Sequence, residues 1–181
     1  SVPSHMRSAI VSMNARYQNF IELGNQEEAE KYLLIDPDDK SEYYSAQGFT
    51  DNIMNICRES SFTFYEKVID EIYLMYKDAG IEMAKFGVAA DELPYGAWQK
   101  SPMCDKFMSE NSISGDYNAL YELMQRRIYS KISSYGATMT GWDDILLKLT
   151  EKNQSETQIK DFFKDDDILP VSYTHLTLPT T

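Results

Sequence analysis

The chain has 181 residues, of which 43% are hydrophobic, and it is therefore long enough to form one domain with a buried core. Its formal net charge of -12 argues against nucleic acid as a partner, because a phosphate backbone is bound through clustered Lys and Arg. The same charge argues against an anionic membrane surface, and no apolar run reaches the roughly 18 residues that a membrane span needs.

The sequence contains two cysteines, Cys57 and Cys104, which lie far apart and have no His or Cys neighbour at the spacing of a zinc site. They are either buried thiols or a single disulfide, and the sequence alone does not choose between these states. We expect buried thiols, no bound metal and no cofactor.

Helical patterns dominate the first part of the chain. Residues 7–33 carry apolar side chains at spacings of three and four, and the break near Gly24 predicts two helices. After a turn-rich connection, residues 60–80 form an amphipathic pattern that predicts a further helix. Ser60 at its start and Gly80 at its end are the residues expected to cap it.

Short apolar segments alternate with the later helices. Residues 81–92 lack a helical period and predict a buried strand of the parallel type. Residues 116–136 repeat the pattern of a helix followed by glycine, and residues 137–148 repeat the short strand. This alternation predicts an α/β fold with parallel strands, namely part of a (β/α)8 TIM barrel, in which the chemistry gathers at the C-terminal strand ends.

Polar and aromatic residues stand at both predicted strand ends. Asp91 and Glu92 stand at the C-terminal end of the first predicted strand, while Trp142, Asp143 and Asp144 stand at the end of the second. Because parallel strands end at one edge of their sheet, we expect the two groups to converge.

Each of these residues also has an interpretation without function. Asp91 could cap a helix that has Pro94 in its first turn. Trp142 could be a core aromatic residue, and Trp98 in the intervening segment is most simply the anchor of a loop.

The two ends of the chain differ from its middle. Residues 171–181 are uncharged and rich in Thr after an acidic stretch, and they resemble translated sequencing-adaptor segments. We therefore expect a barrel domain at residues 1–170 and a non-native tail at residues 171–181. At the other end, SVPSHM resembles a cloning scar, an interpretation that would make His5 foreign as well.

The segment FGVAADELPYGAWQKSPMC, residues 86–104, resembles the signature of the family 20 glycoside hydrolases, the β-N-acetylhexosaminidases. In that family a strand ends in His-x-Gly-Gly-Asp-Glu and is followed by Val-Pro, Gly-x-Trp and often Ser-Pro. The matching residues here are Asp91, Glu92, Pro94, Gly96, Trp98, Ser101 and Pro102.

Three further segments are similar to the family. Residues 14–52 resemble the long connection between its third and fourth barrel strands, and residues 133–145 resemble its fifth strand with the pocket Trp. SVPSHMRSAI falls on its Asp-x-Pro-Gly-His-x-Arg-Ala-Ala-Ile motif, which indicates that His5 is native. The resemblance runs from Ser1 to about Leu149 and covers a central part of the barrel.

The chain departs from the family close to these motifs. Gly87 replaces the histidine that opens the strand motif, Ala89 and Ala90 replace its two glycines, and Ser1 replaces the first aspartate of the N-terminal motif. The family's substrate-gripping arginine and the aromatic and acidic residues of its last strands have no counterpart here. We therefore expect a fragment of the barrel that is inactive alone and associates with itself through open strand edges.

The resemblance implies hydrolysis of terminal β-linked GlcNAc or GalNAc by substrate-assisted retaining catalysis, in which the substrate's 2-acetamido group is the nucleophile. It implies that Glu92 is the general acid and base and that an ionised Asp91 orients the acetamido group. Among substrate-binding residues, Trp142 would wall the pocket and His5 would position Glu92 by hydrogen bonding. The implied partners are N-acetylhexosamine glycans or chitooligosaccharides, and the implied location is periplasmic or extracellular.

Two other interpretations of the chain stay open. The first is a degenerate hexosaminidase-like domain that binds sugars without cleaving them, which Gly87 and Ser1 suggest. The second is an acidic helical interaction module whose resemblance to the family is accidental. A fold with helices and no strands would favour the second interpretation.

Overall fold

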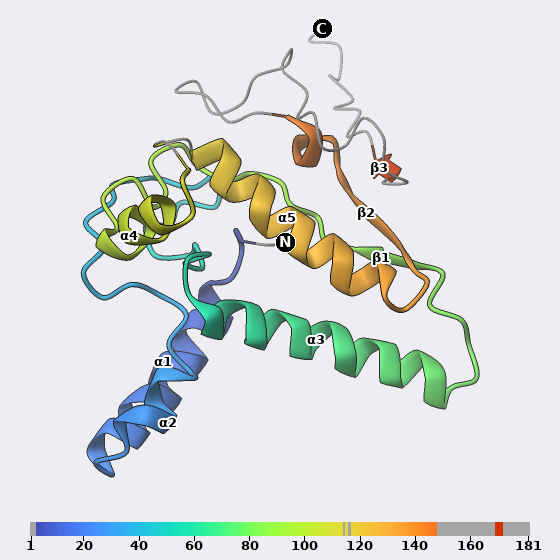
Figure 1. The fold of residues 1–181 in the computed structure, drawn as a ribbon. Coiled ribbons are helices and arrows are strands. Elements are labelled where there is room, and N and C mark those ends of the chain that lie inside the picture. The colour runs from blue at the N-terminus through green and yellow to red at the C-terminus, as the bar shows by residue number, and fades with distance from the viewer. Residues whose placement is uncertain (1–2, 114, 116, 148–168, 172–181) are drawn as a thin grey trace, which may run out of the picture.

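The computed structural model describes residues 3–113, 115, 117–147 and 169–171 of the chain. Helices precede and separate the strands along the described part of the chain (Figure 1). In chain order they are α1 (Arg7–Glu22), α2 (Gln26–Glu30), α3 (Glu59–Asp78), β1 (Lys85–Gly87), α4 (Pro102–Glu110), α5 (Tyr117–Ser133), β2 (Thr138–Trp142), the 3₁₀ helix η1 (Asp143–Leu146) and β3 (Leu169–Val171).

The strands form a parallel sheet in the order β1-β2-β3. Phe86 of β1 lies opposite Met139 of β2, and Trp142 of β2 lies opposite Val171 of β3. The predicted α/β fold with parallel strands is confirmed. The strands consequently present their C-terminal ends at one edge of the sheet, as the expected convergence of the two polar groups requires.

Both predicted strands are shorter in the structure than the sequence pattern suggests. The segment 81–92 contains only β1, because Ala89 and Ala90 adopt φ values of 59° and 60° that turn the chain out of the extended conformation. The described part of the segment 137–148 contains β2, after which the chain winds into η1. Non-strand backbone therefore follows each of these strands at the edge where the site is expected.

β3 is not predicted by the sequence pattern. It lies at the boundary between the predicted domain and the predicted tail, since Val171 is both its last residue and the first residue of that tail. Residues 172–181 lie outside the described part of the chain, so the division after residue 170 stays a prediction.

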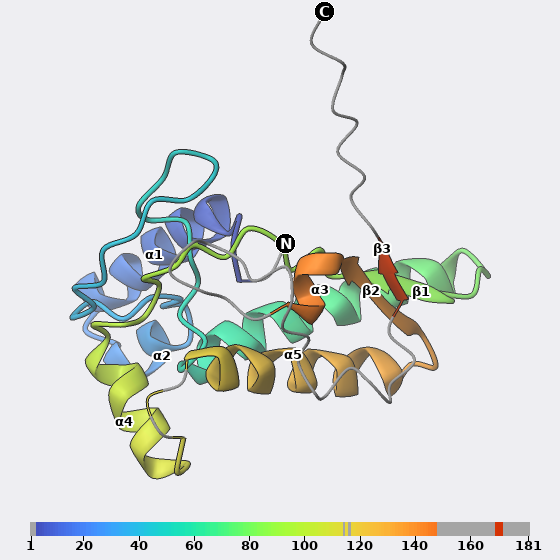
Figure 2. The ribbon, with the colours of Figure 1, turned by 90° about the horizontal axis from the view of Figure 1, so that it is seen from above.

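The two helices predicted within residues 7–33 are present as α1 and α2. They pack against each other and lie at the opposite end of the molecule from β1 and β2 (Figures 1 and 2). The helix predicted at residues 116–136 is present as α5, which packs on β2.

The predicted N-cap of α3 is wrong, whereas its predicted C-terminal stop is confirmed. Arg58 occupies the capping position and its side chain makes no capping hydrogen bond. Ser60 lies inside the first turn, where its hydroxyl donates to the carbonyl of Leu33. After the helix, Gly80 adopts a φ of 67°, a left-handed conformation that favours glycine.

α3 and α5 lie side by side (Figure 1) and are joined around Arg127 of α5. The Arg127 guanidinium donates to Glu59 at 2.6 and 2.7 Å and to Glu66 at 2.7 Å. It also lies over the ring of Phe62, 4.2 Å from the ring centroid. These contacts cover a common core in which Ile132 of α5 is fully buried.

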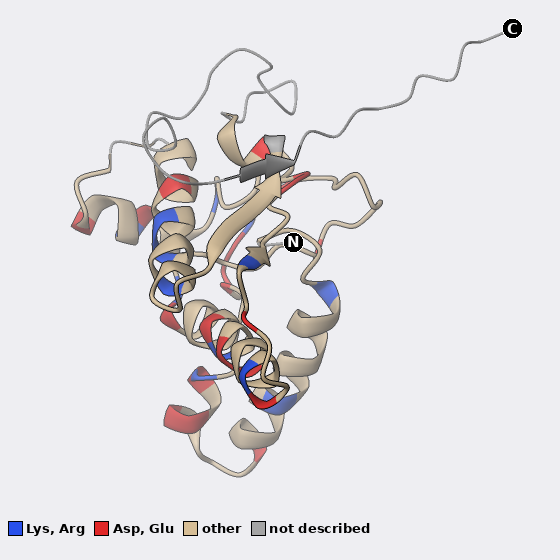
Figure 3. Cartoon of the chain, turned by 90° about the vertical axis from the view of Figure 1, so that its right-hand side faces the viewer, with Lys and Arg blue, Asp and Glu red and all other residues tan. Residues whose placement is uncertain are grey.

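Charged residues are distributed along the helices. Figure 3 shows acidic and basic segments interspersed on the face that it presents. Several form ion pairs one turn apart, such as Lys67–Glu71 at 2.6 Å and Arg126–Glu122 at 2.6 Å. Among the described helices, none combines the length and apolar character that crossing a bilayer requires.

The expectation of two buried thiols is wrong, because Cys57 and Cys104 form a disulfide with a Cα–Cα distance of 5.3 Å. Helix α4, which the sequence analysis leaves as a loop, brings them together. Ser101 caps α4 by accepting a hydrogen bond from the N–H of Cys104, and Pro102 begins the helix. Cys104 thereby comes to lie against Cys57, just before α3.

Replacing both cysteines by serine, or reducing the bond, is expected to lower the free energy of unfolding by up to about 4 kcal/mol, because the bond closes a loop across a sequence separation of 47. Urea unfolding of the oxidised, reduced and doubly substituted chains measures this change. Equal unfolding midpoints for the three forms would contradict a stabilising role for the disulfide.

Candidate active site

Asp91 and Glu92 lie beyond the C-terminal end of β1, in a loop that leads to α4. No helix begins at Asp91, since the next helix along the described chain is α4, which starts at Pro102. The interpretation of Asp91 as a helix cap with Pro94 in the first turn is therefore wrong. The adjacent acids need another structural explanation, and their hydrogen bonds provide it.

The backbone of residues 89–92 is hydrogen-bonded at each residue to a different part of the fold. The bonds are Trp142 N–H to the Ala89 carbonyl (2.8 Å), Tyr121 hydroxyl to the Ala90 carbonyl (2.8 Å), Ser4 hydroxyl to the Asp91 carbonyl (2.6 Å) and Glu92 N–H to the Asp144 carboxylate (3.2 Å). The N-terminal segment, α5, β2 and η1 thus all contribute to holding the two acids.

Close approach of β2 to this loop depends on Gly141. A Cβ at that position would lie 3.1 Å from the carbonyl oxygen of Ala89 and 3.1 Å from the side chain of Ile145, which is tighter than most Cβ contacts. The bond from Trp142 to Ala89 is therefore formed where β2 carries no side chain toward the loop.

Tyr121 supplies the most deeply buried of these bonds. Burial raises the pKa of its phenol, so the hydroxyl stays protonated and can donate to the Ala90 carbonyl. The Tyr121 ring also lies 6.5 Å from the ring of Trp98, measured between centroids. Trp98 is 3% exposed and donates its indole N–H to the carbonyl of Met54, which confirms its interpretation as a loop anchor.

Three residues of the loop have left-handed backbone conformations. Ala89, Ala90 and Glu92 have φ values of 59°, 60° and 56°. Such values are unfavourable for residues with a Cβ and persist where surrounding contacts fix the backbone. Ala89 and Ala90 stand where the resemblance places two glycines, so this chain keeps a glycine-type conformation without the glycines.

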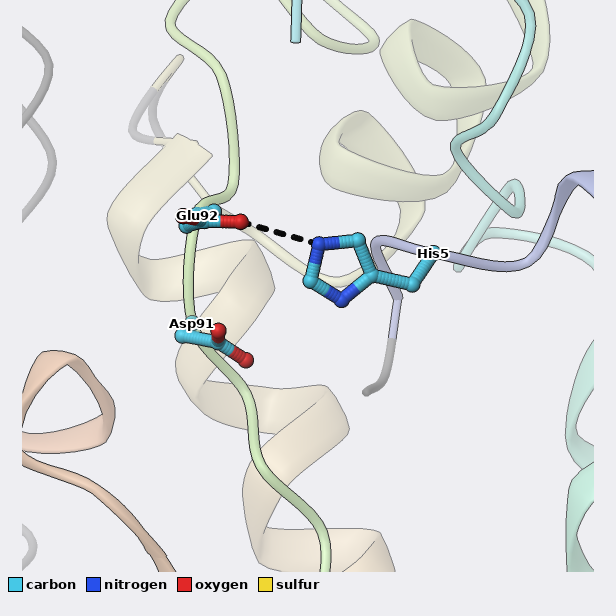
Figure 4. A group of neighbouring side chains, drawn as sticks. All are labelled: His5, Asp91 and Glu92. Atoms are coloured by element: carbon cyan, nitrogen blue, oxygen red, sulfur yellow. Dashed lines mark hydrogen bonds and ion pairs between the residues drawn. The ribbon is translucent and has the colours of Figure 1, made fainter. Parts of the chain in front are cut away.

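His5 reaches the acids from the N-terminal segment. Its Nε2 lies 3.0 Å from Oε2 of Glu92, and its side chain points across the loop toward Glu92 and Asp91 (Figure 4). Two backbone bonds hold this segment. Met6 N–H donates to the Asn52 carbonyl, and Met54 N–H donates to the Pro3 carbonyl. The structure therefore brings together residues that are far apart in the sequence.

The site is open to solvent on the side of these groups. The side chain of Glu92 is 43% exposed and that of His5 is 29% exposed, so a ligand can reach both. A ring nitrogen of His5 and one carboxylate oxygen each of Asp91 and Glu92 all lie within 4.8 Å of one another. Three such atoms at this spacing could hold a metal ion. His5 and Glu92 already contact each other, however, and the absence of a metal stays a prediction.

Trp142 is placed at the end of β2 and is half-buried. Its backbone N–H links it to the acidic loop by donating to the Ala89 carbonyl. The role of its ring as a pocket wall stays a prediction. Ser1, the other family position discussed above, lies outside the described residues.

Asp144 was expected near the acids, and its carboxylate accepts the N–H of Glu92. Three further residues that touch the acidic loop were not predicted, namely Ser4, Gln47 and Tyr121. Ser4 lies within the N-terminal motif, but nothing in the sequence assigns it or the other two a contact with distant residues.

Two adjacent acids anchored beyond the C-terminal end of a parallel strand lie where a (β/α)8 barrel gathers its chemistry. The model of glycosyl hydrolase family 20, catalytic domain, matches residues 1–168. The chain therefore belongs to glycosyl hydrolase family 20, and its fold is part of a (β/α)8 barrel. The interpretation of the chain as a helical interaction module with an accidental resemblance to the family is wrong, because the chain has both the family match and strands.

Relatives with curated names match most of the chain. A beta-hexosaminidase of Vibrio vulnificus is 40% identical over 144 residues, which are 79% of this chain and 17% of that protein. Beta-hexosaminidase B of Pseudoalteromonas piscicida is 32% identical over 143 residues, which are 79% of this chain and 18% of that protein. The chain thus spans less than a fifth of the length of these relatives.

A solved structure matches over a similar range. The family 20 exo-β-N-acetylglucosaminidase of Vibrio harveyi, crystallised in complex with N-acetylglucosamine, matches with a TM-score of 0.59 and 31% identity. The match covers 78% of this chain and 18% of that one.

Ala89→Gly is expected to raise the free energy of unfolding by about 1 kcal/mol, because glycine relieves the cost of the left-handed conformation at this half-buried position. Thermal or urea unfolding measures the change. Ala84→Gly is the control, since Ala84 is exposed and its φ is not positive. There the same substitution should lower stability by about 0.5–1 kcal/mol, and destabilisation at both positions would contradict the strain at Ala89.

Proposed function

We propose that this chain is part of a β-N-acetylhexosaminidase that removes terminal β-linked GlcNAc or GalNAc by substrate-assisted retaining catalysis. The observation that carries the proposal is the anchored pair Asp91–Glu92 beyond a parallel strand, with His5 against Glu92. The names of the related hexosaminidases and the N-acetylglucosamine complex of the Vibrio harveyi enzyme support the substrate class.

Glu92 is the group that handles protons in this proposal. Its carboxyl group is partly exposed at the mouth of the site and protonates the departing glycosidic oxygen. In the second half of the reaction the resulting carboxylate takes a proton from water, which opens the oxazolinium ring with overall retention. His5, hydrogen-bonded to Oε2, keeps the carboxyl group turned toward the substrate.

Asp91 acts on the substrate's acetamido group and does not attack carbon. The acetamido oxygen attacks the anomeric carbon, and positive charge develops on the acetamido nitrogen as the ring closes. An ionised Asp91 orients that group and stabilises the charge, which is present chiefly in the transition state and the intermediate. Trp142, at the end of β2, supplies an apolar wall for the sugar face and the acetamido methyl group.

The competing function is a domain that binds the same sugars without cleaving them. It is favoured by Gly87 and Ser1, which replace a histidine and an aspartate of the family motifs. Among the described residues, a Cβ at position 87 would meet only the Thr140 hydroxyl, at 3.5 Å, so Gly87 is not required by close packing at that atom. Turnover of a chromogenic GlcNAc glycoside by the complete protein separates the two functions.

We also propose a periplasmic or extracellular location. The disulfide between Cys57 and Cys104 supports it, because disulfides persist in oxidising compartments.

We further propose that the isolated chain associates with itself. β1 is an edge of the described sheet, and an open strand edge can pair with another chain. Sedimentation velocity across a concentration series tests the association.

The role of Asp91 is tested in the complete enzyme that carries these residues. That enzyme should cleave aryl GlcNAc glycosides and leave the matching glucosides essentially untouched, because removal of the acetamido group removes the nucleophile. Asp91→Asn should lower kcat on the GlcNAc substrate by about 10²–10³-fold, since it removes a preorganised charge. A glycosyl ester trapped on Asp91, or equal wild-type rates on both sugars, would show a conventional double displacement.

The role of Glu92 is tested by the dependence on the leaving group. Glu92→Gln should lower kcat/KM by about 10²–10⁴-fold for poor leaving groups, which need protonation. The loss should be much smaller for activated aryl glycosides, whose leaving groups depart without a proton. Equal losses on the two substrate classes would remove Glu92 from the acid role.

A further inference from the structure

Gln47 contacts the same carboxylate oxygen as His5, and no motif of the sequence points to it. Its side-chain amide donates to Oε2 of Glu92, the oxygen that lies 3.0 Å from Nε2 of His5. We propose that Gln47 is a positioning residue that, with His5, commits Oε2 of Glu92 to accepting hydrogen bonds and leaves Oε1 to carry the transferred proton. This inference rests on the proposed function of Glu92.

The chemistry of an amide fixes the direction of this bond. Gln47 can donate only through its Nε2 group, and its Oε1 accepts from Nδ2 of Asn52 at 3.5 Å. In the reverse orientation, the amide oxygen of Gln47 would face Oε2 of Glu92, so two acceptors would oppose each other. The amide NH₂ of Gln47 would then face the NH₂ of Asn52, which is also a donor. Gln47 therefore faces Glu92 as a donor.

The two carboxylate oxygens of Glu92 have different surroundings as a result. Oε2 receives the amide of Gln47 and lies beside the ring nitrogen of His5. Within the described residues, Oε1 makes no hydrogen bond to the protein. A proton on Oε2 would compete with the Gln47 donor, whereas a proton on Oε1 would meet no such donor within the described residues. Proton transfer to and from substrate is thereby directed to one oxygen.

A tight turn presents Gln47 to the site. Gly48 N–H donates to the carbonyl of Ser45 at 2.9 Å, and Phe49 N–H donates to the Ser45 hydroxyl at 3.1 Å. Ser45 is buried at the base of the turn, while Gln47 is exposed at its tip. Gln47 can therefore be substituted without opening the core.

The turn and the His5 segment form one connected unit. Asn52 is 1% exposed, donates its side chain to Gln47 and accepts the N–H of Met6, the residue after His5. Arg7 pairs with Asp51 at 2.8 Å. Gln47 and His5 are thus fixed relative to each other, so the carboxylate of Glu92 is held from one side although its side chain is 43% exposed.

The contact itself is tested in the 181-residue chain by NMR, independently of any activity. The side-chain amide protons of Gln47 should resonate downfield, and Glu92→Leu should shift them upfield because it removes the acceptor. Asp91→Asn is the matched control, since Gln47 bonds to Glu92 and not to its neighbour. Chemical shifts of the Gln47 amide protons that do not change in the Glu92→Leu variant would overturn the proposal.

The positioning role is tested by kinetics in the complete enzyme. Gln47→Met keeps the length of the side chain and removes the donor, and it should lower kcat by about 10-fold or more with little change in KM, as expected for an outer hydrogen-bond partner. The loss should be larger for poor leaving groups than for activated aryl glycosides. Gln18→Met, an exposed substitution on α1, should leave both parameters and the melting temperature unchanged.

Two results distinguish failure of this inference from failure of the proposed function. Equal losses on both leaving groups, or none, in an active enzyme would overturn the role of Gln47 while the function stands. If the complete enzyme does not cleave 2-acetamido sugars, the proposed function is wrong. The catalytic positioning role of Gln47 is then wrong as well, because it rests on that function. The NMR result would then still decide whether Gln47 holds Oε2 of Glu92.

Discussion

The position of the two acids depends on hydrogen bonds to the backbone of residues 89–92. This segment belongs to no helix or strand, and three of its residues hold left-handed conformations that a free chain would leave. Four bonds from the N-terminal segment, α5, β2 and η1 engage three of its carbonyls and one of its N–H groups and hold these conformations. The adjacency of Asp91 and Glu92 therefore becomes a defined geometry only when the other elements are in place.

The chain beyond the acids is fixed by a second, buried set of polar contacts. The Ser101 hydroxyl donates to Asp36 at 2.6 Å and accepts from Asn55 at 3.2 Å, next to the disulfide at the start of α4. Burial acts to raise the pKa of Asp36, but hydrogen bonds to its carboxylate outweigh it and hold the pKa below its ordinary value. Together with the bond from Trp98 to Met54, these contacts hold the C-terminal end of the loop that carries the acids.

Support for Glu92 comes from outside the sheet. The family histidine at position 87 is absent, and the space there is not filled by other atoms within close contact of a Cβ. His5 and Gln47, both on the segments joined through Asn52, contact Oε2 of Glu92. The position of the Glu92 carboxylate consequently depends on the N-terminal segment and on the turn at residues 45–48.

The sequence by itself determined the alternation of helices and parallel strands, the family and the acidic pair, because these follow from local periodicity and a contiguous motif. Tertiary structure alone decided the pairing of Cys57 with Cys104, since the bond depends on how α4 packs beside the start of α3. It also ended β1 early and brought Ser4, Tyr121 and Gln47 to the acidic loop. Such contacts join residues far apart in the chain, and no local pattern encodes the packing that makes them neighbours.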